Sequence, residues 1–113
     1  MSDFTQSLIN IRSEYEQKAE QFAEAWLATR RLILKLFTEA VQALNGAKIE
    51  HENGTSSTLS WRNASISFKA DEKRRRIVRS RPGEQDEPYE PSALTQDKIE
   101  SEVRSFVRAV LEG

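Results

Sequence analysis

Apolar residues repeat with a helical period along the first 45 positions of the chain. Two series of four have the same spacing of eleven residues: Phe4, Tyr15, Trp26, Phe37, and Ile11, Phe22, Ile33, Leu44. Eleven residues are close to three helical turns, so both series stay on one side of a nearly straight helix. Neither Gly nor Pro occurs between Ser2 and Asn45, and Gly46 can adopt the left-handed conformation that ends helices. The pattern predicts one helix over residues 1–45.

This helix is too long to be covered by a domain of its own size. Between Ser2 and Asn45 it would be about 66 Å long, whereas a compact domain of this length has a radius of gyration of about 13 Å. Part of the apolar row therefore needs a partner, and we expect a homodimer built on an antiparallel helix pair. Six residues form the candidate oligomer interface: Phe4, Leu8, Ile11, Tyr15, Phe22 and Trp26.

Residues 47–81 change to the alternating pattern of strands. Lys48–Glu52 alternates, and Asn53-Gly54 after it is a strong two-residue hairpin signal. Residues 58–61 and 64–69 alternate as well, but their parity changes at Arg62-Asn63, which indicates a tight turn or a bulge. A turn at residues 71–73 precedes a last strand in residues 74–80. We expect a three- to four-stranded antiparallel meander with one apolar face.

The last third of the chain contains a loop and a second helix. Residues 82–91 contain all three prolines and four acidic residues, which predicts an acidic Pro-rich loop. Residues 92–112 have an apolar stripe of helical spacing, which predicts a C-terminal amphipathic helix. The whole chain, 1–113, is then a single α+β domain: a long N-terminal helix, the meander and a C-terminal helix.

The composition excludes several classes of protein. With no cysteine among 113 residues, thiolate metal sites, disulfides and cysteine nucleophiles are excluded. The N-terminus lacks the basic and apolar regions of a secretory signal, and the longest apolar run, residues 32–34, is far below the ~20 residues of a membrane span. We expect a cytoplasmic protein with no membrane partner.

Residues that could support catalysis are sparse. His51 is the only histidine, and its neighbours Glu50 and Glu52 point to the other face of the same strand. No glycine-rich phosphate loop or metal-ligand spacing accompanies it. We therefore expect an ordinary surface or half-buried histidine, and a protein that is not an enzyme and has no catalytic residues, cofactor or metal.

Charge is strongly segregated near the end of the meander. Residues 62–81 contain eight basic and two acidic residues, and four acidic residues follow in the loop. The candidate basic interaction surface comprises Lys73, Arg74, Arg75, Arg76, Arg79 and Arg81. It can be a solvated face that the loop neutralises, a protein-binding surface, or a phosphate-binding surface. The function that we predict is a small homo-oligomeric protein-interaction module, an adaptor or regulator; the alternative is a nucleic-acid-binding protein that uses the Lys73–Arg81 hairpin.

Overall fold

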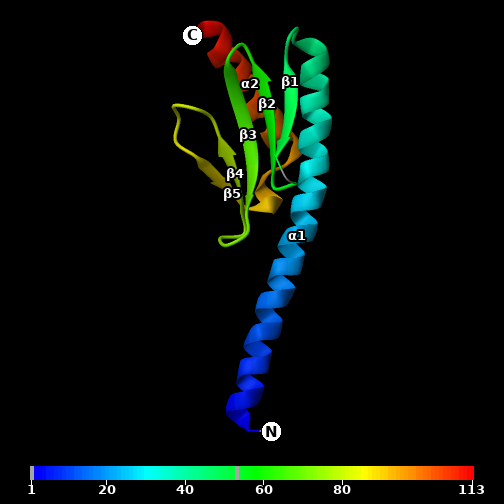
Figure 1. Cartoon of the computed structure of the whole chain (residues 1–113), viewed down its shortest axis with the longest axis vertical. Helices are drawn as coiled ribbons and strands as arrows, with labels where there is room; N and C mark the ends of the chain where they lie inside the picture. Colours follow the sequence, from blue (N-terminus) through cyan, green and yellow to red (C-terminus); the bar gives the residue numbers. More distant parts are fainter. Residues whose placement is uncertain (1, 53) are drawn as a thin grey trace.

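The chain forms a small sheet domain from which one half of a long helix projects (Figure 1). A computed structural model describes residues 2–52 and 54–113. The molecule measures 64 × 24 × 24 Å, and its radius of gyration is 17.6 Å. These dimensions reflect the mismatch between helix length and domain size that the sequence predicts.

Helix α1 spans Asp3–Ala43 and has a defined start and end. Oγ of Ser2 accepts a hydrogen bond from the backbone N–H of Thr5 at 3.2 Å, which caps the first turn. At the other end, Leu44 N–H donates to the Ala40 carbonyl, and Gly46 has φ +89°. The uninterrupted sequence therefore forms an uninterrupted helix, as expected.

The sheet is an antiparallel meander of five strands in the order β1-β2-β3-β4-β5. Its strands are β1 (Lys48–Glu52), β2 (Ser56–Trp61), β3 (Ala64–Asp71), β4 (Arg76–Ser80) and β5 (Glu87–Tyr89). Arg62 and Asn63 both have positive φ, 51° and 63°, so a two-residue turn joins β2 to β3 and accounts for the parity change. The α+β class is confirmed. Asn53, predicted as a turn residue, lies outside the described residues.

The sequence did not predict strand β5, which lies within the region expected to be a loop, 82–91. Pro88 is opposite Val78 and pairs at the edge of the sheet, where a residue without an N–H is tolerated. A short 3₁₀ helix, Pro91–Ala93, follows it. Helix α2 then spans Gln96–Glu112, starting later than residue 92 because Thr95 accepts the Lys98 N–H as its cap.

The core lies between one face of the sheet and the two helices. Phe37 of α1 and Phe68 of β3 have no exposed surface, and their ring centroids are 6.0 Å apart. Buried residues from every layer surround them: Ile33, Leu59, Trp61, Ile66, Ile77, Ile99 and Phe106. Leu44 and Val110 are partly buried against this cluster. The strand faces predicted from alternation are confirmed, since Leu59 is opposite Ile66 on the buried face.

Candidate functional site

The first half of α1 exposes a continuous apolar face. We call residues 3–21 the arm, because they extend below the sheet domain (Figure 1) and Phe22 is the first buried residue of the helix. Phe4 is 72% exposed, Leu8 50%, Ile11 49% and Tyr15 60%. Their spacing of four, three and four residues places them on one side of the helix. Four of the six candidate interface residues are thus available to a partner.

The other two candidates, Phe22 and Trp26, belong to the chain's own core. Each is only 6% exposed, and Nε1 of Trp26 donates a hydrogen bond to the Gly54 carbonyl at 3.1 Å. The expectation that they form the oligomer interface is therefore corrected. The sheet domain covers the apolar row down to Phe22, and the row continues beyond this cover without any change in its pattern.

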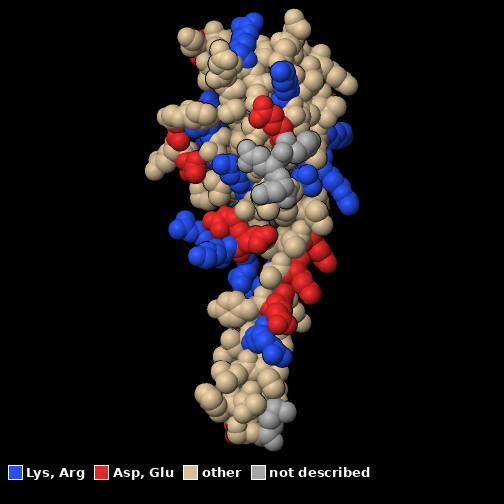
Figure 2. Space-filling model, in the orientation of Figure 1, with Lys and Arg blue, Asp and Glu red and all other residues tan. Residues whose placement is uncertain are grey.

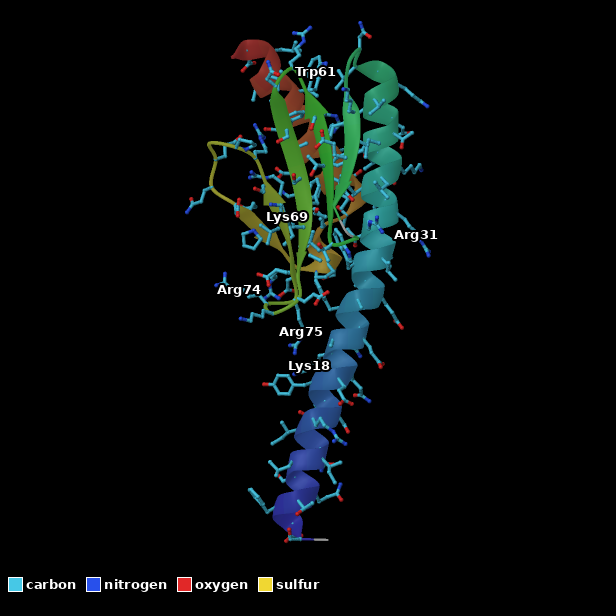
Figure 3. All side chains as sticks on the ribbon, viewed as in Figure 1. Lys18, Arg31, Trp61, Lys69, Arg74 and Arg75 are labelled. Carbon is cyan, nitrogen blue, oxygen red and sulfur yellow. The ribbon has the colours of Figure 1, made fainter. Side chains whose placement is uncertain are left out.

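The turn between β3 and β4 reaches the base of the arm (Figure 3). Asp71 Oδ1 accepts the Arg74 N–H at 3.2 Å, and Arg75 at φ 54° turns the chain back into β4. The guanidinium carbon of Arg75 lies 5.5 Å from the ring centroid of Tyr15. The turn therefore lies over the apolar face at its last exposed large side chain.

A pocket separates this turn from the helix. It has a volume of about 250 Å³ and is lined by Ala19, Phe22, Ala23, Trp26 and Glu72. The alanines leave this space because they are the small members of the helix face. The junction between arm and domain is thus incompletely filled.

The six residues of the candidate basic interaction surface do not form a single surface. Arg79 and Arg81 are both 8% exposed, because Arg79 shares the strand parity of Ile77 and points toward α2. Arg79 pairs with Glu102 of α2, and Arg81 pairs with Glu84 at 2.6 Å. The expectation that these two arginines present an interaction surface is corrected.

Arg76 is also paired, with Glu90 at 3.2 Å, although its side chain is 41% exposed. The accessible basic residues are Lys73, Arg74 and Arg75, which we call the basic turn. In Figure 2, basic and acidic side chains gather side by side at the lower edge of the domain, above the arm.

The acidic residues after β4 neutralise part of the basic charge inside the molecule. Two of the four predicted loop acids, Glu84 and Glu90, form ion pairs with Arg81 and Arg76. Glu102, the partner of Arg79, was missed, because it is 23 residues away on α2. Only its place on the half-buried flank of an amphipathic helix hinted at a partner.

Tyr89 of β5 lies beside this pair. Burial raises the pKa of its phenol above 10.0, and the negative charges of Glu102 and Glu87 raise it further, while Arg79 lowers it. No group of three or more possible metal-ligating side chains occurs within the described residues. His51, predicted to be an ordinary surface or half-buried histidine, has its side chain outside the described residues.

None of the helices in residues 2–52 and 54–113 is long and apolar enough to cross a membrane. Comparisons of the chain with protein-family models, with curated proteins and with solved structures gave no significant match.

Proposed function

We propose that this chain is a non-enzymatic, homo-oligomeric protein-interaction module, of adaptor or regulatory type, in which the arm associates with a second copy. One observation carries the proposal: four large apolar side chains lie exposed on one face of a helix that projects from the domain. Single exposed apolar residues are common on protein surfaces, whereas contiguous ones mark interaction sites.

The strength of this association follows from the size of the face. Full burial of a large apolar side chain contributes about 1.5–3 kcal/mol, and these four are only about half to three-quarters exposed. Association itself costs several kcal/mol of translational and rotational freedom. We therefore expect a dimer with a dissociation constant of about micromolar, in equilibrium with the monomer at ordinary protein concentrations.

Sedimentation equilibrium with two variants tests the proposal. Leu8→Lys with Ile11→Lys places two charges in the apolar face, so this variant should remain monomeric across the concentrations at which the parent protein dimerises. Ser13→Lys is the matched control, because residue 13 lies on the opposite side of the helix and is exposed. A parent protein that stays monomeric up to several hundred micromolar contradicts the proposal.

The alternative function, nucleic-acid binding by the Lys73–Arg81 hairpin, has weaker support. Three of its six basic residues are held in ion pairs within the chain. The remaining basic turn offers three charges, and phosphate contacts of that number give weak, salt-sensitive binding. The arm exposes four large apolar side chains, whereas the basic turn offers only three charges that are unpaired within the described residues. For this reason we place self-association first.

A further inference from the structure

We propose, on the basis of the proposed self-association, that two arms pair antiparallel and in one register, with the N-terminal end of each arm seated against the basic turn of the other copy. The partner is thus a second copy of this chain. The basic turn limits how far the second arm extends along the first, and it supplies the opposite charge to Asp3.

The register follows from the spacing of the exposed residues. In an antiparallel pair, Phe4 lies opposite Tyr15 of the second copy when Leu8 lies opposite Ile11, so all four exposed side chains of each arm meet four others. A shift by one heptad in one direction places Phe4 opposite Phe22, which the domain already covers. A shift in the other direction leaves two of the four without a partner. One register therefore buries the whole face.

The position of the turn agrees with this register. Arg75 lies over Tyr15, so an arm that runs along this face reaches the turn when its Phe4 arrives at Tyr15. The preceding residues, Ser2 and Asp3, then extend only to the level of residues 16 and 17, below the first buried residue, Phe22. The second arm therefore ends before the part of α1 that the sheet domain covers, and its Phe4 lies beside Arg75 at the Tyr15 ring.

Charge favours the antiparallel orientation over the parallel one. A parallel pair brings the two copies of Tyr15 together, and with them the two basic turns, in each of which three positive charges follow Asp71 and Glu72. An antiparallel pair separates the turns and places each one beside Asp3 of the other copy. Asp3 is the only charged residue among positions 2–11. It lies in the first turn of α1, so its carboxylate both offsets the positive end of the helix dipole and faces the basic turn of the other copy.

Engineered disulfides measure the orientation directly, because the chain contains no cysteine. Ser7 and Glu14 lie on the same side of the exposed apolar row of the arm. Positions that share a side in this way face each other across an antiparallel helix pair. Mixing Ser7→Cys protein with differently tagged Glu14→Cys protein under mild oxidation should therefore give the mixed disulfide. A parallel pair would instead join Ser7→Cys to Arg12→Cys. Ser13→Cys, on the opposite side of the arm, is the control for random collision.

Charge exchange tests the contact with the turn. One variant carries Asp3→Lys, and a second carries Arg74→Glu together with Arg75→Glu. Each should raise the dissociation constant of the dimer roughly two- to fivefold at low salt, because each breaks exposed ion pairs. The three substitutions together should restore the parental dissociation constant, whereas fraying of the helix start by Asp3→Lys would not be rescued by changes in the turn.

The outcomes separate this inference from the proposed function. A cross-link between Ser7→Cys and Arg12→Cys overturns the antiparallel arrangement and leaves self-association intact. Failure of the three combined substitutions to restore the dissociation constant overturns the contact between Asp3 and the basic turn in the same way. A protein that never dimerises overturns both. The expected result is the Ser7–Glu14 cross-link together with rescue.

Discussion

Arg79 of β4 and Glu102 of α2 form a direct ion pair between the sheet and the helix layer, with side chains only 10% and 17% exposed. Nη1 of the same arginine is buried and has no hydrogen-bond partner among the described residues. Within the described residues, Glu102 is the carboxylate in ion-pair contact with this guanidinium.

Removing that carboxylate should destabilise the fold strongly. We expect Glu102→Ala to lower the free energy of unfolding by about 2–4 kcal/mol, because a buried charge is left without its partner. Glu100→Ala is the matched control on the same helix: its partner, Arg104, is 61% exposed, so the loss should stay below about 0.5 kcal/mol. Urea unfolding of the two variants measures both. Equal losses would show that water reaches Arg79.

Tyr89 should make stability fall at alkaline pH. Its folded pKa is raised above 10.0, first by burial and then by Glu102 and Glu87, so the unfolded chain releases the phenolic proton at lower pH than the folded one. The stabilisation is complete below pH 10 and is lost as the pH rises through 10 toward the folded pKa. Tyr89→Phe should flatten this dependence. Absorbance titration at alkaline pH in a Tyr15→Phe background reports Tyr89 alone, and a midpoint below 10 would contradict the assignment.

Two phenylalanines, one in the core and one on the arm, should differ sharply in their effect on stability. Phe68→Ala creates a cavity in the core and should cost about 3–5 kcal/mol, because Phe68 has no exposed surface. Phe4→Ala, at a residue 72% exposed, should change the monomer by less than about 0.5 kcal/mol. Thermal melting at low concentration compares them, and a wild-type melting temperature for Phe68→Ala would exclude the described register.

Polyanion binding should respond selectively to the acidic loop. Glu90→Gln frees Arg76, which is 41% exposed, and should lengthen retention on heparin at low salt. Glu84→Gln should have little effect, because Arg81 stays buried beneath it. The gain from Glu90→Gln should shrink at higher salt, since exposed charges are screened beyond about 10 Å. If neither the parent nor the Gln variants bind, the nucleic-acid alternative has no support.

The helices, the strand faces and most of the core could be predicted from sequence, because periodicity reports them directly. Leu59, Ile66 and Ile77 point inward as their alternation indicates. The interface prediction for Phe22 and Trp26 was wrong for a physical reason. The large apolar residues from Phe4 to Phe37 that make up the row share one face of α1, so the sequence does not reveal where the domain's cover ends.

Strand β5 and the Arg79–Glu102 pair could not be predicted because both depend on tertiary contacts. Residues 87–89 are too short and too polar to show alternation, and they pair only because β4 offers a free edge. An ion pair between residues 23 positions apart is decided by how α2 packs on the sheet. Local patterns do not specify which distant residues such contacts join.

The single unbroken helix also sets how protection from hydrogen exchange varies along the chain. Amides of α1 between Ile33 and Phe37 open only with the core. Those near Phe4 can fray turn by turn, because the side chains around them are exposed and no other described element covers them. Exchange in a lone copy should therefore slow progressively from the N-terminal turn toward Phe22. Contact with a second copy should slow it most at the outermost turns, which makes the amide of Leu8 a reporter of assembly that needs no label.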